Sequence, residues 1–240
     1  MQIEGRNPVY ESLVSQSPIK KIFMNEGIKR DAKILSIIEL AKANDVKIYY
    51  KSKRYLNNIA ATAIHQGIIA IKEDRDSWTL KPFIQKLEKD GTDPFFVYIR
   101  ESLNEYNIGS IIRSAEIVGA QLVILPPKTH LSPQMIRASM GASEHITIIN
   151  ENLFQAIKLA KTHNIKVIGI ELTGENYYYN SDLKGPTMLI IGGEDRSLSD
   201  EIKKKCDLFV KIPMRGKVNS LNMSVAASIV MFEKLKQELT

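Results

Sequence analysis

The feature that most constrains the fold is the strict alternation of strand-like and helix-like segments from Phe95 onward. The run KVIGIEL at residues 166–172 is almost continuously apolar, as in strands buried on both faces of a parallel sheet. Such alternation predicts an α/β domain of about six strands with helices on both faces. Ligands bind such sheets outside the carboxyl ends of the strands, where Gly192, Pro213 and the turn after Leu172 are expected.

The last strand, loop and helix have the features of a ligand-binding turn. The strand DLFVKI at residues 207–212 is ended by Pro213, which lacks a backbone donor. A polar loop follows, and Ser220 and Asn222 open a helix. Polar residues at a helix start are usually caps, and they also stand where backbone donors are exposed to a ligand. One stripe of this helix carries apolar residues at helical spacing, namely Leu221, Val225, Ile229 and Phe232.

Three segments of this half resemble the motifs of the SpoU–TrmH branch of the SPOUT RNA methyltransferases. NIGSIIRSAEIVGA at residues 107–120 is similar to the first motif, GGEDRSLS at 192–199 to the second, and IPMRGKVNSLNMSVA at 212–226 to the third. They stand in the order of the family. The resemblance implies a catalytic domain with a deep trefoil knot at its carboxyl-terminal part, which periodicity alone would not suggest because knots are very rare.

The resemblance further implies transfer of a methyl group from S-adenosylmethionine (AdoMet) to a ribose 2′-hydroxyl of RNA. The matching catalytic positions are Arg113, Asn107, Glu194, Ser220 and Asn222. Arg113 is assigned to the hydroxyl. Because the pKa of arginine lies above 12, we interpret it as a group that grips the ribose or a phosphate and stabilises the developing alkoxide, although proton removal by it stays open.

Cofactor contacts in this family come largely from backbone groups, and no GxGxG-like turn follows an early strand as it would in a Rossmann enzyme. The matching or neighbouring positions are Gly192, Ile212, Leu221, Met214, Gly216 and Thr173.

The sequence departs from the family at loop positions. Asn104 and Glu105 replace an aspartate–proline pair, and Asp195 and Ser197 replace glycines. These departures bear on which RNA is modified more than on the chemistry.

Residues 1–90 alternate helix-like and strand-like segments and predict a small α/β domain. EKDGTDP at residues 88–94 is interpreted as a linker to the catalytic domain at residues 91–240. GRNPVYESL at residues 5–13 and HQGIIA at 65–70 resemble the amino-terminal substrate-binding domain of many SpoU-type enzymes, which engages RNA.

Four residues of this first domain are candidates for RNA contact: Arg6, Lys53, Arg54 and His65. Lys53 and Arg54 belong to a basic and aromatic cluster that also holds Lys51, Tyr49, Tyr50 and Tyr55, a composition suited to phosphates and unpaired bases. A solvated surface is the alternative for this cluster. His65 could equally be a turn histidine with local hydrogen bonds, and no second ligand at suitable spacing supports a metal site.

Charge and cysteine content indicate the kind of partner and the cellular compartment of the protein. The net charge of +6 and the isoelectric point near 9.2 favour a polyanionic partner. A lone cysteine, Cys206, suits a reducing compartment and is expected to be a semi-buried residue. We see neither a transmembrane run nor a secretory signal, so a cytoplasmic protein without membrane contact is expected.

Several functions stay open. We expect a ribosomal RNA methyltransferase, with a tRNA enzyme, a resistance-type rRNA enzyme and a non-catalytic RNA-binding module as alternatives. The family also implies a homodimer. The apolar side of the last helix (Val225, Ile229 and Phe232) is compatible with a dimer interface and equally with burial inside one chain.

Overall fold

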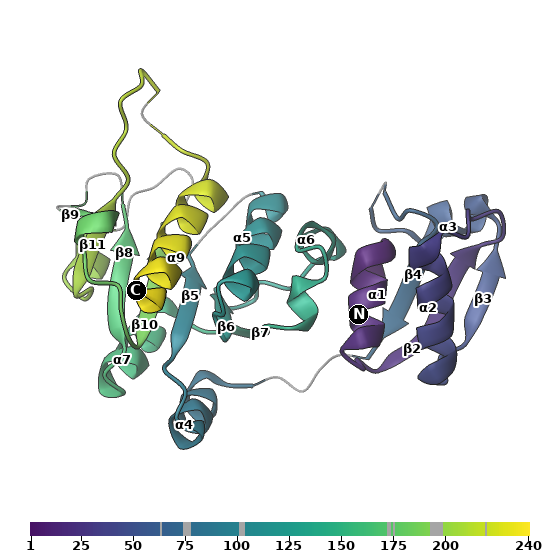
Figure 1. Cartoon of the computed structure of the whole chain (residues 1–240), viewed down its shortest axis with the longest axis horizontal. Coiled ribbons are helices and arrows are strands. Elements are labelled where there is room, and N and C mark those ends of the chain that lie inside the picture. The colour runs from purple at the N-terminus through teal and green to yellow at the C-terminus, as the bar shows by residue number, and fades with distance from the viewer. Residues whose placement is uncertain are drawn as a thin grey trace. The chain divides into compact units, whose positions relative to one another are not determined.

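The computed structural model describes residues 1–62, 64–73, 78–100, 104–171, 174, 176–192, 199–218 and 220–240. The chain divides into two compact units (Figure 1). One unit comprises residues 1–76 and 131–145, and the other comprises residues 77–130 and 146–240.

The first unit contains a mixed sheet of four strands in the order β1-β4-β2-β3. The strands are β1 (Gln2–Glu4), β2 (Ile19–Asn25), β3 (Ile48–Lys51) and β4 (Ile68–Lys72). β4 runs antiparallel to both β1 and β2, whereas β2 and β3 are parallel. The sequence predicted strands at residues 19–24, 47–52 and 67–72, which correspond to β2, β3 and β4. It did not reveal β1, because three residues carry too little periodicity.

Helices pack on both faces of this sheet. They are α1 (Arg6–Val14), α2 (Ala32–Ala43), α3 (Lys53–Ile59) and α6 (Pro133–Ala138), with a short 3₁₀ turn η1 (Ala142–Glu144). Val9, Ile34 and Ile136 join Ile22 and Ile68 of the sheet in one core. On the other face, Leu56 of α3 packs against Phe23 and Ile69.

The segment 131–145, expected within the catalytic domain, packs in the first unit instead. Lys72 at the end of β4 donates to both carboxylate oxygens of Glu144, at 2.6 and 2.7 Å, and both side chains are almost completely buried. Ser17 adds a hydrogen bond of 2.8 Å to Glu144. Gly141 lies so close to α1 that a Cβ there would meet the Glu11 Cγ at 2.3 Å. These contacts join segments far apart in sequence, which no local pattern could reveal.

The second unit contains seven strands in the order β7-β6-β5-β10-β8-β11-β9, and every pairing is parallel. They are β5 (Phe95–Ile99), β6 (Leu122–Leu125), β7 (Thr147–Asn150), β8 (Lys166–Ile170), β9 (Asn176–Tyr177), β10 (Thr187–Ile191) and β11 (Leu208–Lys211). This confirms the expected parallel α/β class. The six longer strands are the predicted ones, and β9 is an addition. The trefoil knot stays a prediction.

The helices of this unit cover both faces of its sheet. They are α4 (Leu80–Asp90), α5 (Glu105–Ile117), α7 (Leu153–Thr162), α8 (Asp200–Lys203) and α9 (Met223–Leu239), with a 3₁₀ turn η2 (Tyr178–Asn180). α4 and α7 pack with Phe96 and Tyr98 in one core, and α5 lies beside α9 (Figure 1).

The division between the units therefore differs from the expected boundary at residue 90. Phe83 and Ile84 of α4 are buried with Phe96, so the segment 88–94 connects α4 to β5 within one unit rather than linking two domains. No described helix is long and apolar enough to cross a membrane.

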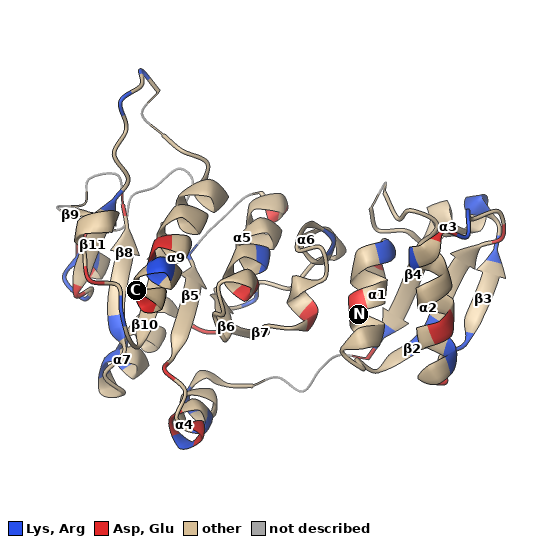
Figure 2. Ribbon diagram, in the orientation of Figure 1, with Lys and Arg blue, Asp and Glu red and all other residues tan. Residues whose placement is uncertain are grey.

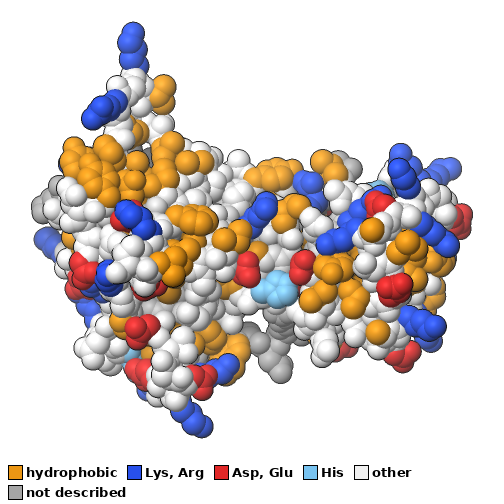
Figure 3. Space-filling model, in the orientation of Figure 1, with side chains coloured by type: hydrophobic (Ala, Val, Ile, Leu, Met, Phe, Trp, Pro, Cys, Tyr) orange, Lys and Arg blue, Asp and Glu red, His pale blue; other side chains and the backbone are white. Residues whose placement is uncertain are grey.

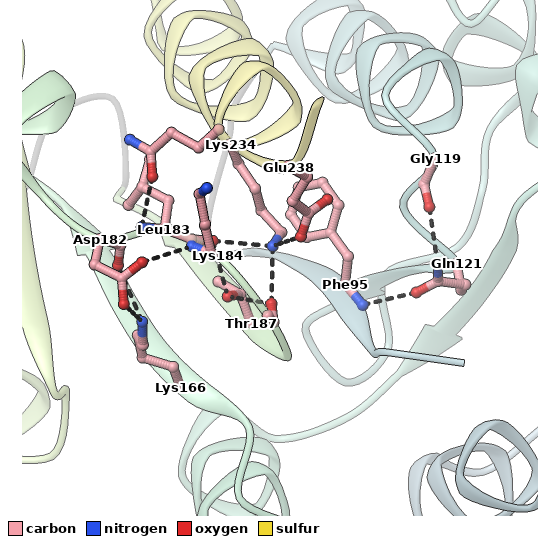
Figure 4. A network of polar contacts seen from close by, with 12 residues as sticks. Phe95, Gly119, Gln121, Lys166, Asp182, Leu183, Lys184, Thr187, Lys234 and Glu238 are labelled. Atoms are coloured by element: carbon pink, nitrogen blue, oxygen red, sulfur yellow. Dashed lines mark hydrogen bonds and ion pairs between the residues drawn. The ribbon is translucent and has the colours of Figure 1, made fainter. Parts of the chain in front are cut away.

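The carboxyl-terminal helix α9 is fixed by a buried lysine (Figure 4). The Lys234 ammonium donates to the carbonyls of Leu183 and Gly185, at 3.0 and 2.8 Å, and to Glu238 at 2.6 Å. The Phe95 ring lies 4.9 Å from the same nitrogen. These groups compensate the charge of a side chain that is 0% exposed. They hold α9 against the loop before β10.

Candidate active site

The carboxyl ends of neighbouring parallel strands form one edge of the second sheet. Strands β6 and β7 lie on one side of β5, whereas β10, β8 and β11 lie on the other. The strand order therefore reverses between β5 and β10, which makes this position the topological switch point of the sheet. Ligands bind at such switch points in open α/β sheets. In register, Ile191 of β10 lies beside Ile170 of β8, which pairs with Val210 of β11. Gly192 and the segment beginning at Ile212 therefore start from the same edge.

Gly174 brings the turn after β8 against the backbone of β11. A Cβ at this position would lie 2.8 Å from the Val210 carbonyl carbon and 3.0 Å from the Lys211 nitrogen. Only glycine allows such an approach of two backbones. At Gly192 a Cβ would meet the Ile170 oxygen at an ordinary 3.6 Å. Thr173 lies outside the described residues.

The connection from β11 to α9 carries most of the predicted cofactor positions and projects from the unit (Figure 1). Met214 and Leu221 are each 40% exposed and Val218 is 72% exposed, while Ile212 is half-buried and Gly216 and Ser220 are exposed. Figure 3 shows hydrophobic and basic side chains along this connection. The connection thus offers apolar surface and backbone groups beside the strand ends.

Two predicted site residues meet at the junction of α5 and α9. The Asn222 Nδ2 donates to the Oδ1 of Asn107 at 3.0 Å. The Oδ1 of Asn222 caps α9 by accepting from the backbone N–H groups of Ser224 and Val225, at 2.9 and 3.3 Å. Because the cap occupies the oxygen, the amide nitrogen faces Asn107. The first and third motifs are therefore joined by one hydrogen bond.

A second polar contact holds the same two helices together. The hydroxyls of Ser114 and Ser228 lie 2.8 Å apart, and Ser228 also donates to the Ser224 carbonyl at 2.7 Å. Neither serine is among the site residues predicted from the sequence. Ser114 stands seven residues after Asn107, about two helical turns, so the spacing placed both on one side of α5.

Arg113 lies on a different side of α5 from Asn107. Its side chain is exposed, and it follows Tyr106, which is 46% exposed, by seven residues, about two turns. Its guanidinium forms no ion pair or hydrogen bond with the residues that the structure describes. The structure thus leaves the guanidinium open to a ligand, and it does not bring Arg113 against the two asparagines. Glu194 lies outside the described residues.

Two predicted RNA contacts of the first unit have local partners. Arg6 forms an ion pair with Asp31, and the pKa of Asp31 is lowered by the backbone hydrogen bond from Ile34 and by this arginine. His65 is only 7% exposed. Its Nδ1 accepts from the Gly67 N–H at 3.1 Å, so its Nε2 carries the proton and donates to Asn57 Oδ1 at 2.9 Å. His65 therefore shapes the turn before β4.

The other two predicted contacts are open. Lys53 and Arg54 form the first turn of α3 and are exposed. Tyr49, Tyr50 and Tyr55 nearby are 43%, 42% and 38% exposed. The basic and aromatic cluster predicted from sequence is thus an accessible surface.

The lone cysteine has no nucleophilic character. Burial raises the pKa of Cys206 to about 12, with a smaller contribution from Asp207, so the thiol stays protonated at neutral pH. In the part of the chain that the structure describes, no group of three His, Cys, Asp or Glu residues could hold a metal ion.

A parallel sheet with its candidate ligand edge at the switch point defines an α/β protein of the ligand-binding kind. The sequence pattern of the SpoU rRNA methylase family matches residues 94–232, more than half of the chain. The pattern for RNA 2′-O ribose methyltransferase substrate binding matches residues 2–78. The chain therefore belongs to the SpoU rRNA methylase family, which confirms the resemblance seen in its motifs.

Individual proteins agree with this assignment. YacO of Bacillus subtilis, assigned to the TrmH family of tRNA/rRNA methyltransferases, is 34% identical over 95% of this chain and 92% of its own length. The SpoU methyltransferase AviRb from Streptomyces viridochromogenes, solved with the cofactor AdoMet, superposes with a TM-score of 0.81 at 21% identity, over 100% of this chain and 90% of that one. The AdoMet-bound rRNA methyltransferase from Sinorhizobium meliloti gives 0.79 at 23% identity, over 100% and 87%. At these identities the two structures establish the shared fold.

Proposed function

We propose that this protein transfers the methyl group of AdoMet to a ribose 2′-hydroxyl of ribosomal RNA. The observation that carries the proposal is the hydrogen bond between Asn107 and Asn222, which joins two predicted catalytic positions at the junction of α5 and α9. Membership in the SpoU rRNA methylase family supports the reaction, and the substrate-binding pattern over residues 2–78 supports RNA. We place this activity in the cytoplasm.

The strand ends suit the cofactor. Gly174 lets the backbone after β8 pack against β11, and Gly192 adds no side chain at the end of β10, so a ligand can approach the backbone at Gly192. Met214 and Leu221 supply exposed apolar surface for an adenine. AdoMet, when bound, supplies a methyl group activated by its sulfonium. We assign it to Gly192, Ile212, Met214, Gly216, Leu221 and Thr173.

The remaining task of the protein is to align the ribose oxygen and to stabilise its developing charge. Arg113 has the fixed cationic fork for this task, and its exposed position leaves it accessible to RNA. We assign the alignment of the nucleotide to Asn222, Ser220 and Glu194, with Asn107 acting through the loop that it holds. Asn107 is 7% exposed, so we infer that it holds the loop in place more than it touches substrate.

We further propose a homodimer through α5 and α9. Ile117 and Tyr106 of α5 are 55% and 46% exposed, and Val225 and Phe232 of α9 are 45% and 46% exposed. Apolar surface of this kind on two adjoining helices suits an isologous interface. Light scattering should give twice the mass of 27.1 kDa for the wild type, and a Phe232→Glu variant should shift toward the monomer.

Incubation with labelled AdoMet and unmodified RNA tests the function. Ribosomal RNA should take up label at one ribose, and the Arg113→Ala variant should lose transfer while still binding AdoMet and RNA. Label in the tRNA fraction alone would favour the second candidate, a tRNA enzyme, which the tRNA/rRNA name of the B. subtilis relative leaves open. A wild-type protein that binds both ligands without turnover would be a binding module instead.

A further inference from the structure

One face of the first sheet carries aromatic and basic side chains around Phe23. Side chains alternate along a strand, so Lys21 and Phe23 of β2 share a face. Tyr49 pairs in register with Phe23 and lies on that face with Lys51. Tyr50 pairs with Met24, which is buried in the core on the opposite face. Tyr49 and Tyr50 therefore point to opposite sides of the sheet. Their side chains are exposed to nearly the same extent, 43% and 42%.

Tyr55 of α3 completes the aromatic group. The Phe23 ring centroid lies 5.9 Å from that of Tyr49 and 5.7 Å from that of Tyr55, at interplanar angles of 42° and 57°. Phe23 itself is only 9% exposed, so it supports the two tyrosines from below. Each tyrosine ring is tilted against Phe23 rather than stacked on it, and the two rings are 43% and 38% exposed, so each keeps accessible ring surface.

Positive charge surrounds these rings. The ammonium groups of Lys51 and Lys21 lie 5.3 Å from the ring centroids of Tyr55 and Phe23, respectively. No aspartate or glutamate occurs between Asp45 and Glu73, a stretch that contains Lys47, Lys51, Lys53 and Arg54. Figure 2 shows the resulting basic segments at α3 and at the adjoining end of β3.

We propose that this surface, formed by Tyr49, Tyr55, Lys21, Lys51, Lys53 and Arg54, binds an unpaired stretch of RNA. Bases stack on Tyr49 and Tyr55, and the phosphates lie along the lysines and Arg54. This inference rests on the proposed function, because it takes RNA as the substrate, and it adds which form of RNA the first unit captures.

The rings and cations of this surface should bind unpaired RNA and duplex RNA differently. A duplex buries the faces of its bases and presents phosphates and 2′-hydroxyls, so it can use the cations of this surface but not its rings. An unpaired strand can use both. The preference for single strands should therefore depend on Tyr49 and Tyr55, whereas the sensitivity to salt should depend on the basic residues.

The test uses the full-length protein without AdoMet and a fluorescent RNA of about 12 nucleotides, alone or annealed to its complement. In anisotropy titrations the wild type should bind the single strand more tightly. Tyr49→Ala and Tyr55→Ala should each weaken that binding by about 5- to 150-fold, with little effect on the duplex. Tyr49→Phe and Tyr55→Phe should bind like the wild type. Arg54→Ala should lower the salt slope by about 0.7.

Tyr50→Ala is the matched control, because Tyr50 has nearly the same exposure on the opposite face. Equal losses from Tyr50→Ala and Tyr49→Ala would overturn the proposal, as would equal binding of single strand and duplex. A strand that contains 4-thiouridine, photo-crosslinked to the wild type, keeps the test independent of mutant folding. Crosslinks to Tyr49 or Tyr55 support the proposal, and crosslinks confined to other regions contradict it.

The two proposals fail separately. Binding is measured without AdoMet and without methyl transfer, so its outcome does not depend on whether the catalytic residues work. A wild type that methylates RNA but shows no role for Tyr49 and Tyr55 would refute only this surface. A protein that binds through the two rings but transfers no methyl group would refute only the catalytic function.

Discussion

The side-chain amide of Asn222 at the start of α9 donates a hydrogen bond of 3.0 Å to the Oδ1 of Asn107 in α5. Asn222 uses its own oxygen to cap α9, so one side chain sets the first turn of the helix and its attachment to α5. The loop before α9 holds most of the predicted cofactor positions. The position of that loop is therefore tied to α5, which also carries Arg113.

Removing the acceptor should separate catalysis from helix capping. Asn107→Ala leaves the Asn222 cap intact but deprives its Nδ2 of a partner, so the free energy of unfolding should fall by about 1 kcal/mol. Methyl transfer should fall about 10-fold or more, because the loop loses its attachment. Initial rates with labelled AdoMet and urea unfolding measure the two effects. Asn107→Asp keeps an acceptor oxygen and should retain more stability, and a full rate in Asn107→Ala would refute the role.

A methyl group at Gly174 should disturb the edge of the sheet. In Gly174→Ala the new Cβ would stand 2.8 Å from the Val210 carbonyl carbon, a backbone atom that cannot move aside without shifting β11. The expected loss of stability is about 1–3 kcal/mol, with weaker AdoMet binding in calorimetry. Gly27→Ala is the control, since its Cβ would lie an ordinary 3.4 Å from the Asn25 side chain. Equal melting temperatures for both variants would contradict the close approach.

The buried ion pair of the first unit should respond asymmetrically to substitution. Glu144→Gln removes the carboxylate that receives both hydrogen bonds from the buried Lys72 ammonium, so the free energy of unfolding should fall by about 3–5 kcal/mol. A double variant, Lys72→Met with Glu144→Met, removes both charges and should recover most of that loss. Denaturant unfolding of both variants and of Lys72→Met gives the coupling energy. A double variant less stable than Glu144→Gln would contradict the argument.

Alkaline pH should destabilise the second unit through Tyr98. Burial, with a smaller contribution from Glu151, raises the pKa of Tyr98 from 10.0 to about 12. The folded state therefore favours the neutral phenol, and the stability that this shift gives is complete below pH 10 and is lost as the pH rises to about 12. Tyr98→Phe should be less stable than the wild type at pH 8, and the difference should shrink by pH 11. Urea unfolding at both values measures it, and a constant difference would rule out this titration.

The sequence predicted what local periodicity and motif order encode. The apolar run at residues 166–172 contains the central parallel strand β8, because such strands are apolar on both faces. Asn222, expected at the start of the last helix, caps α9 because its side-chain oxygen accepts from free N–H groups there. The motifs also identified the family, since their order along the chain needs no structure to be read.

The tertiary structure decided which of these residues meet. Asn107 contacts Asn222 across 115 positions, and Glu144 contacts Lys72 across 72. Both contacts depend on how elements pack, and local patterns carry no such information. Packing also decided that residues 131–145 belong to the first unit. Of the predicted RNA contacts, His65 pairs with Asn57 and Arg6 pairs with Asp31. Sequence thus determined the elements and the family, whereas packing determined the polar contacts, because a hydrogen bond forms only between groups that the folded chain brings within reach.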